Sequence, residues 1–323
     1  MVSRRDLLVG AAAGAALLAR RMTSLRAAAS QPATAVRFEV PAGACDCHTH
    51  IFGGPRRFPL DPDRVYTPEP ASIEEMRALH RALHMDRVVI VQPSIYGTDN
   101  ACTLEAVRQF GSRARAVAVI DEQVSAAALD GMHDAGVRGI RINLATSGQT
   151  DPAAARHRLR TAGAQLRGRP WHIQMYTNLP MVDAIRDDVV ASAVPIVFDH
   201  FGGAQARLGT GQPGFNALLE LVRSGKAYVK ISGAYRSSTA APGYADVAPL
   251  AKALIAANPQ RILWGSDWPH PDSSRVAGRK ATDIAPLLQI DDGLVLNQLP
   301  AWAPAPAQRK TILVDNPARL YGY

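Results

Sequence analysis

The chain has 323 residues, of which 47% are hydrophobic and 20% are charged, an ordinary composition for a globular protein that excludes a disordered chain. The formal net charge is +8, but residues 1–29 contain five arginines and one aspartate, and the rest of the chain, with 31 basic and 27 acidic residues, carries only +4. This excess is too small to indicate nucleic acid as a partner.

The first 29 residues have the pattern of an export signal. Arg4 and Arg5 precede an apolar run rich in alanine and glycine at 7–19, and alanines at 27–29 provide small residues for cleavage before Ser30. A paired arginine before such a run resembles a twin-arginine signal peptide, so we expect the twin-arginine export machinery as a partner and a periplasmic location. The apolar run of about 13 residues is too short to span a bilayer, so no stable membrane association is expected after cleavage. An uncleaved N-terminal anchor is the alternative.

After residue 40, short apolar runs alternate with stretches of helical periodicity. The predicted strands are 44–48, 87–92, 114–120, 137–144, 171–176, 195–200, 227–232 and 261–266. The predicted helices are 72–84, 102–110, 125–135, 153–167, 180–191, 215–224, 244–257 and 282–289. The clearest helix start is a capping box of Ser72 and Glu75, followed by apolar residues on one face.

Eight strand–helix units in sequence indicate an α/β protein, and we predict a single (β/α)8 TIM barrel domain that spans residues 30–323. A doubly wound open sheet would give the same alternation. It is the weaker alternative because no Gly-x-Gly-x-x-Gly motif follows a predicted strand.

The first predicted strand contains the sequence Asp46-Cys47-His48-Thr49-His50. Alternate side chains of a strand share a face, so His48 and His50 should point the same way. Two imidazoles that converge on one point suit metal binding or polarisation of a carbonyl group. A pair of surface histidines at a strand end is the alternative interpretation.

Polar and ionisable residues stand at the ends of the later strands. Those that we single out are Ser94, Arg141, Tyr176, His200, Arg236 and Asp267. Each has a structural explanation of its own: Asp267 could cap a turn, His200 could be a satisfied core histidine, and Arg141 could form an ion pair inside the barrel. Because barrel enzymes carry their chemistry at the carboxyl ends of the strands, their joint occurrence there predicts an active site.

Four motifs resemble the amidohydrolase superfamily in its amidohydrolase-2 branch. They are Asp-Cys-His-Thr-His at 46–50, Asp-His-Phe-Gly-Gly at 199–203, Trp-Gly-Ser-Asp-Trp-Pro-His at 264–270 and Asp-Asn-Pro-Ala-Arg-Leu-Tyr-Gly at 315–322. Within this branch, residues 92–100 and 230–236 are similar to 2-pyrone-4,6-dicarboxylate lactonases and related sugar-acid lactonases and lactone isomerases.

The resemblance implies a hydrolase that acts on the ester bond of a carboxylate-bearing lactone, and it assigns a catalytic set and a set of substrate hydrogen-bonding residues, to which the two strand-end arginines add a third set. Asp267 is expected to be the general base, with His48, His50 and His200 polarising the carbonyl. Tyr176, Tyr66 and Ser94 are expected to hydrogen-bond the substrate. Arg236 and Arg141 are expected to bind its carboxylate, because a guanidinium matches the two oxygens of that group.

No cofactor is predicted, although zinc is an alternative. Zinc members of the superfamily take a further histidine from the end of the fifth strand, where this chain has Tyr176. The nearest candidate, His172, lies roughly 13 Å further down that strand. If a metal is present, His48, His50 and Asp267 are the expected ligands. The competing interpretations are a metal-dependent hydrolase or decarboxylase of the same branch, and a non-catalytic periplasmic binding protein.

One departure bears on the substrate. The lactonase relatives have a second arginine shortly after the strand-four arginine, and the corresponding segment 144–148 contains none. This weakens the expectation of a doubly charged pyrone dicarboxylate. An aldaric lactone with one carboxylate fits as well, and isomerisation between lactone ring sizes would use the same groups.

Overall fold

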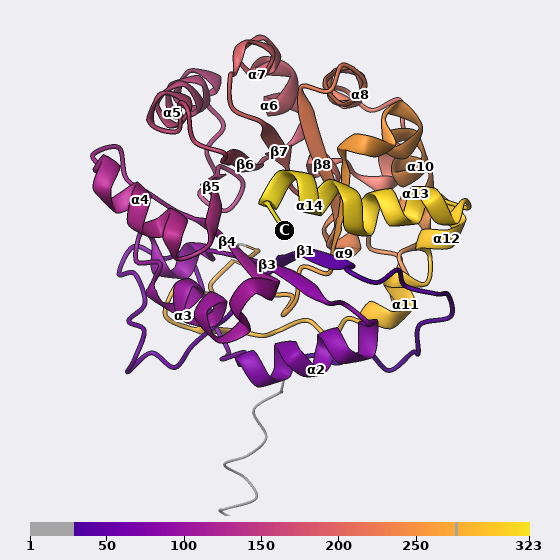
Figure 1. The fold of residues 1–323 in the computed structure, drawn as a ribbon, viewed down its shortest axis with the longest axis horizontal. Coiled ribbons are helices and arrows are strands. Elements are labelled where there is room, and N and C mark those ends of the chain that lie inside the picture. The colour runs from indigo at the N-terminus through magenta and orange to yellow at the C-terminus, as the bar shows by residue number, and fades with distance from the viewer. Residues whose placement is uncertain (1–28, 275–276) are drawn as a thin grey trace, which may run out of the picture.

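The structure is a computed structural model that describes residues 29–274 and 277–323. Eight parallel strands form one sheet in the order β1-β3-β4-β5-β6-β7-β8-β9, with helices around it (Figure 1). The strands are β1 Cys45–Thr49, β3 Arg87–Val91, β4 Ala114–Ala118, β5 Val137–Asn143, β6 His172–Tyr176, β7 Ile196–Phe198, β8 Ala227–Ser232 and β9 Ile262–Gly265. All eight predicted strands are present. The predicted signal peptide, apart from Ala29, lies outside the described residues.

The barrel is closed where β1 meets the segment that follows β9. Asp267 N donates to the His48 carbonyl at 2.8 Å, and His50 N donates to the Trp268 carbonyl at 2.8 Å. Thr49 and Trp268 form a parallel bridge there. These contacts complete a single (β/α)8 barrel, as predicted, and they tie the two strands that carry the main motifs to each other.

Thirteen helices cover the barrel in the described part of the chain. They are α2 Ile73–Leu83, α3 Ala101–Phe110, α4 Ala126–Asp134, α5 Pro152–Gln165, α6 Leu179–Ala184, α7 Arg186–Ala191, α8 Phe215–Arg223, α9 Ala234–Ser237, α10 Ala248–Ala257, α11 Asp292–Leu296, α12 Leu299–Trp302, α13 Pro306–Lys310 and α14 Asn316–Tyr321. None of these helices is long and apolar enough to cross a membrane. The capping box of Ser72 and Glu75 begins α2, as predicted.

Two helix predictions are corrected by the structure. The stretch 180–191 is two helices, α6 and α7, which meet at Ile185. The stretch 282–289 is not a helix, because it contains the short strand β10, Ile284–Ala285, which pairs with β2, Thr67–Pro68. Pro286 follows β10 directly and lacks the N–H group that a helix interior requires.

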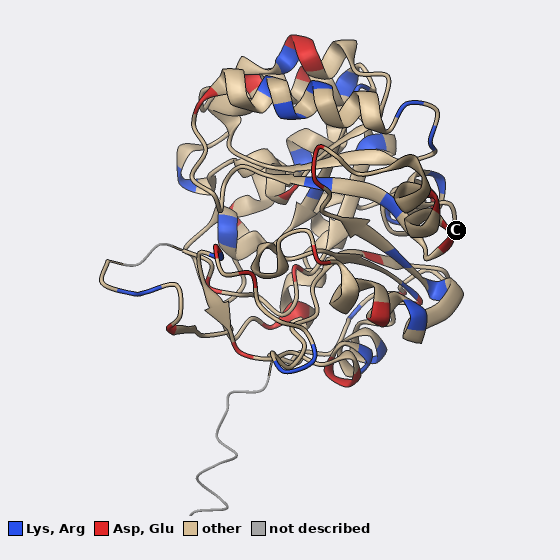
Figure 2. Cartoon of the chain, turned by 90° about the vertical axis from the view of Figure 1, so that its left-hand side faces the viewer, with Lys and Arg blue, Asp and Glu red and all other residues tan. Residues whose placement is uncertain are grey.

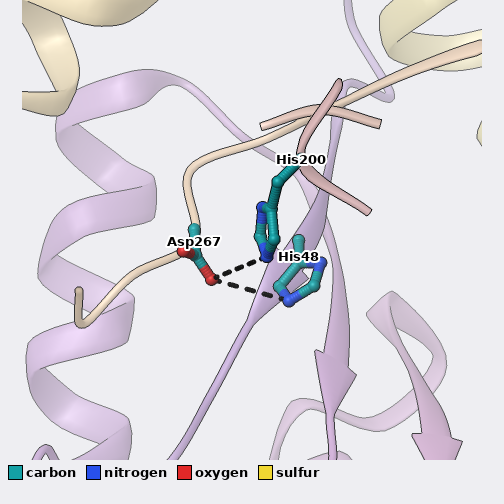
Figure 3. A group of neighbouring side chains, drawn as sticks. All are labelled: His48, His200 and Asp267. Atoms are coloured by element: carbon teal, nitrogen blue, oxygen red, sulfur yellow. Dashed lines mark ion pairs between the residues drawn. The ribbon is translucent and has the colours of Figure 1, made fainter. Parts of the chain in front are cut away.

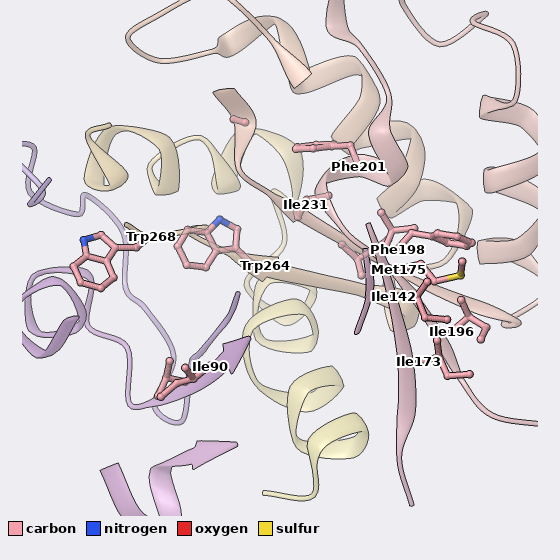
Figure 4. Packing of buried hydrophobic residues seen from close by; sticks show 14 of the residues in the cluster. Ile90, Ile142, Ile173, Met175, Ile196, Phe198, Phe201, Ile231, Trp264 and Trp268 are labelled. Atoms are coloured by element: carbon pink, nitrogen blue, oxygen red, sulfur yellow. The ribbon is translucent and has the colours of Figure 1, made fainter. Parts of the chain in front are cut away.

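Alternation along the strands separates the core from the barrel interior. On β6, Ile173 and Met175 belong to the apolar core, whereas Gln174 between them hydrogen-bonds inside the barrel. Figure 4 shows Ile173 and Met175 packed with Ile142, Ile196 and Phe198. Polar residues on the other strand face therefore point into the barrel, which is what allows a buried polar site to form.

The outer surface carries charges of both signs. In Figure 2, basic and acidic residues are interspersed over the helices on the side that faces the viewer. This mixture agrees with the small net charge outside residues 1–29.

Candidate active site

The predicted catalytic residues come together inside the barrel at the carboxyl ends of its strands, which we call the upper end. His48 lies in β1 and His50 directly follows it, His200 follows β7, and Asp267 follows β9. Their exposed fractions are 0%, 3%, 1% and 0%. Figure 3 shows the Asp267 carboxylate directed at the rings of His48 and His200.

Tight backbone turns aim two of these side chains inward. His200 has φ 48° and Asp267 has φ 68°, values that non-glycine residues seldom adopt. Gly233 approaches both of them, since a Cβ atom there would lie 2.9 Å from Asp267 Oδ2 and 3.0 Å from His200 Nδ1. A side chain at position 233 would therefore push Asp267 and His200 apart.

The two oxygens of the Asp267 carboxylate have different surroundings. Oδ2 accepts hydrogen bonds from Arg236 Nε at 2.5 Å and from the Tyr235 hydroxyl at 2.7 Å. Within the described part of the chain Oδ1 makes no hydrogen bond, and it faces three imidazoles. Its distances are 3.5 Å to His48 Nε2, 3.6 Å to His50 Nε2 and 3.8 Å to His200 Nε2. One oxygen therefore anchors the carboxylate, and the other is buried without a hydrogen-bond partner among the described residues.

The charge states follow from burial and from these contacts. Burial by itself would raise the pKa of Asp267, but the charge of Arg236 and the neighbouring imidazoles hold that pKa well below its usual range. Burial lowers the pKa of His200 to about 4 and that of His48 well below its usual value, the latter partly opposed by Asp199. Near neutral pH the cluster therefore consists of a carboxylate among neutral imidazoles.

A second layer of charged residues lies directly below His48. Asp199 Oδ1 is 3.2 Å from His48 Nδ1, and Asp199 Oδ2 accepts a hydrogen bond from Gln174 Nε2 at 3.0 Å. Arg141 Nη2 lies 3.5 Å from the same Oδ2, and the Lys230 ammonium lies 3.6 Å from Oδ1. Arg141 thus forms an ion pair inside the barrel, which the sequence analysis named as its structural explanation.

The predicted substrate-binding residues surround the cluster. The Tyr176 ring lies edge-on to the His200 ring, with 5.0 Å between the ring centroids. The guanidinium carbon of Arg236 lies 5.8 Å from the centroid of the Tyr176 ring. Tyr66 is buried beside Ser94, and burial raises its pKa to about 12 in spite of the nearby guanidinium groups.

Two separate cavities are lined by predicted substrate-binding residues, and His48, His50, His200 and Asp267 line neither of them. One, of about 400 Å³, is lined by Tyr176, Tyr235 and Arg236. The other, of about 520 Å³, is lined by Ser94 and Arg141. The charged residues thus border space that a small ligand can enter.

The sequence matches the profile of the amidohydrolase family, described as "Amidohydrolase", over residues 45–323. The chain belongs to the amidohydrolase family. It is therefore an enzyme of that family, and the interpretation as a non-catalytic binding protein falls away.

This amidohydrolase is similar to three curated relatives over most of its length. A 4-sulfomuconolactone hydrolase from Hydrogenophaga intermedia is 34% identical over 89% of this chain and 91% of that protein. A 2-pyrone-4,6-dicarboxylate hydrolase from Comamonas testosteroni is 33% identical over 88% and 92%. A D-galactarolactone isomerase from Agrobacterium fabrum is 29% identical over 87% and 91%.

Among solved structures, a Pseudomonas putida protein solved as a candidate 2-pyrone-4,6-dicarboxylic acid hydrolase superimposes with a TM-score of 0.70. It is 32% identical and covers 88% of this chain and 98% of its own.

The donor set of the amidohydrolase fits a zinc ion. Nitrogen and oxygen ligands at about 2.0–2.2 Å from a tetrahedral zinc lie roughly 3.3–3.6 Å apart. One ligand atom each from His48, His200 and Asp267 lies within 4.8 Å of the others, and His48 Nε2 and Asp267 Oδ1 have no hydrogen-bond partner. The expected set had His50 in the place of His200. The structure brings His200 into the group, because the turn after β7 directs its ring at Asp267.

Five site residues were given no role by the sequence analysis: Gln174, Asp199, Lys230, Gly233 and Tyr235. Lys230 carried a usable signal, because a lysine in the middle of an apolar strand must be paired if that strand is buried. Gln174 carried a similar signal in β6. The contact of Tyr235 with Asp267 depends on the loop after β8 and has no counterpart in a local pattern.

Proposed function

We propose that this amidohydrolase hydrolyses the ester bond of a lactone that bears a carboxylate. The observation that carries the proposal is the Asp267 carboxylate, whose Oδ2 is anchored by Arg236 and Tyr235 while Oδ1 faces three imidazoles. Ester hydrolysis needs a base beside an electrophile that is held by donors, and this arrangement can supply both. Two curated relatives at 33–34% identity are named as hydrolases of lactones, which supports the same chemistry.

The attacking water is assigned to Asp267 and His50. His50 Nδ1 lies 2.7 Å from the Val91 carbonyl oxygen, which can only accept, so Nδ1 carries the proton and the Nε2 of a neutral His50 is an acceptor. A water molecule between His50 Nε2 and Asp267 Oδ1 would donate to both. This replaces the expected role of His50 as a polariser of the carbonyl, whereas His48 and His200 keep that role.

The reaction then balances with Asp267 as the proton carrier. Asp267 takes a proton from water as the water oxygen bonds to the lactone carbonyl carbon, and N–H groups of His48 and His200 donate to the oxyanion that forms. Collapse of this intermediate breaks the ring C–O bond. The proton on Asp267 passes to the leaving oxygen, and the product is a hydroxy acid.

Arg236 and Arg141 are proposed to bind the substrate carboxylate. Arg236 already donates through Nε to Asp267 and through Nη1 to Ser273 Oγ at 3.3 Å, and it lines the neighbouring cavity, where its Nη2 would meet a ligand carboxylate. Arg141 borders the other cavity while remaining near Asp199. Because segment 144–148 lacks the additional arginine, we propose a substrate with one carboxylate, such as an aldaric lactone, rather than a pyrone dicarboxylate.

Catalysis is proposed to proceed without a tightly bound metal. If zinc binds, His48, His200 and Asp267 would hold it, and it would supply polarisation of the lactone carbonyl. Metal analysis of the purified protein tests this proposal. We expect less than stoichiometric zinc and unchanged turnover after treatment with a chelator, and stoichiometric zinc with loss of activity on chelation would overturn it.

Isomerisation between lactone ring sizes is the second candidate, because the chain is also 29% identical to a D-galactarolactone isomerase. A panel of sugar-acid and aromatic-derived lactones, followed with a pH indicator and by NMR, separates the two reactions. Hydrolysis releases a proton for each turnover and gives an open-chain acid. Isomerisation gives a new lactone with no released acid, and that outcome would replace hydrolysis as the activity.

We also propose export through the twin-arginine route, on the pattern of residues 1–29. Replacing Arg4 and Arg5 together by lysine should leave the protein in the cytoplasm, as measured by fractionation of cells that produce the full chain. A periplasmic double variant would show that the signal was misinterpreted.

A further inference from the structure

Lys230 is a fully buried lysine inside the barrel, in the middle of β8. Its Nζ donates to Gln174 Oε1 at 2.5 Å, and it lies 3.3 Å from His48 Nδ1 and 3.6 Å from Asp199 Oδ1. A buried ammonium must be matched by acceptors, and Lys230 has two hydrogen-bond partners, Gln174 Oε1 and His48 Nδ1, together with the charge of Asp199. Lys230 therefore bears directly on the protonation of His48.

His48 Nδ1 lies between two groups of opposite character. Asp199 Oδ1, at 3.2 Å, can only accept a hydrogen bond, whereas the Lys230 ammonium can only donate one. A neutral imidazole carries a single N–H. If that proton is on Nδ1, the partner is Asp199 and Nε2 presents a lone pair. If Lys230 donates to Nδ1, the proton is on Nε2.

The opposite side of the His48 ring favours the second form. Nε2 faces Asp267 Oδ1 at 3.5 Å, and neither atom has another hydrogen-bond partner. A lone pair that faces a carboxylate oxygen is repelled unless a cation or a donor such as water lies between them, whereas an N–H group is attracted directly. The Nε2–H form is thus the one that suits the cluster without a metal ion.

We propose that Lys230 is a positioning residue that donates to His48 Nδ1 and thereby keeps the His48 proton on Nε2. In this form Nε2 can donate to an oxyanion, and it has no free lone pair with which to bind a metal. Without the ammonium, Asp199 is left as the hydrogen-bond partner of Nδ1, the proton moves to Nδ1, and Nε2 joins His200 and Asp267 as a zinc ligand. The catalytic consequence rests on the proposed function, whereas the proton position and the zinc affinity do not.

Zinc affinity, measured in competition with a chromophoric chelator, is the first test. Lys230→Met should bind Zn²⁺ at least about tenfold more tightly than the unmodified protein, the scale on which groups behind a ligand tune metal affinity. Lys226→Met is the matched control, because Lys226 is an exposed lysine just before the same strand. Lys230→Gln keeps a donor and should stay close to the unmodified protein. Equal affinities for Lys230→Met and the unmodified protein would overturn the proposal.

Nitrogen NMR of ¹⁵N-histidine-labelled protein is the second test, with His48→Gln used to assign the His48 signals. The unmodified protein should show a protonated Nε2, and Lys230→Met should show a protonated Nδ1. Asp199→Asn, useful if Lys230→Met does not fold, should leave the His48 pattern unchanged, and a change there would mean that Asp199 already holds the proton. These measurements remain informative if no lactone is turned over, so failure of the proposed function and failure of the Lys230 proposal are distinguishable.

Discussion

The lower and upper ends of the barrel interior both contain buried histidines. Only at the upper end do these histidines lie beside a carboxylate that could take part in a reaction. His172 begins β6 at the lower end and is fully buried, and neither of its ring nitrogens has a hydrogen-bond partner among the described residues. Tyr321, from α14, packs edge-on against it at 5.2 Å. Burial lowers the pKa of His172 to about 3. His172 is therefore a neutral packing residue.

His200, at the upper end, is equally buried, and its pKa is lowered to a similar value of about 4. The difference lies in its neighbours. Its Nδ1 is 3.0 Å from the Ser232 hydroxyl and its Nε2 is 3.8 Å from Asp267. Burial alone thus makes an imidazole inert, and a carboxylate within reach on one side with an orienting partner on the other makes it usable.

Removing the Asp267 carboxylate should abolish the difference between the upper and the lower end of the barrel. Asp267→Asn keeps the shape of the side chain but cannot take a proton from water, so kcat should fall by about 10²–10⁴ while substrate binding changes little. Steady-state kinetics and a binding titration on the same lactone measure the two effects. A variant that keeps more than about a tenth of the activity would remove Asp267 from the role of base.

The two arginines of the upper end should be distinguishable by substrate charge. Arg236→Met should lower kcat/KM by about 30-fold or more, because loss of one partner of a buried charge pair costs about 2–5 kcal/mol. Since Arg236 also anchors Asp267, neutral lactones should be affected as well.

Arg141→Met should lower kcat/KM for acidic lactones and leave neutral lactones of the same ring nearly unchanged, because the ion pair of Arg141 is with Asp199 and not with the Asp267 carboxylate. Kinetics on a matched pair of charged and neutral lactones is the measurement. Equal losses on the two for Arg141→Met would show that Arg141 supports the fold through Asp199.

The lower end should respond in stability and not in rate. Unfolded histidine takes up a proton near pH 6.5, whereas folded His172 does so only near pH 3. Between these values the unfolded chain binds more protons, so stability is lost as pH falls below 6.5, by about 1.4 kcal/mol per pH unit for each such histidine.

His172→Leu should reduce this slope in denaturant unfolding measured between pH 6.5 and 4, with turnover near neutral pH retained. His157→Leu is the matched control, because it removes a histidine whose side chain is exposed. An unchanged slope in His172→Leu would show that His172 is protonated in the folded protein.

The sequence by itself determined the barrel and the composition of its upper end. Strand periodicity located all eight strands, and in a barrel every strand presents its carboxyl end at the same face. Residues as distant as His48, His200 and Asp267 are therefore brought together by topology alone. The capping box of α2 was equally readable, because its two hydrogen bonds are made within four consecutive residues.

Only the tertiary structure decided the contacts between side chains from different strands. It paired Arg236 with Asp267, placed Lys230 beside His48, and turned the expected helix at 282–289 into a strand that pairs with residues 67–68. Hydrogen-bond direction and charge pairing depend on a few ångströms between groups far apart in the chain, and no local propensity encodes such distances. The sequence could therefore show which residues belong to the site. Their individual roles depended on the folded geometry.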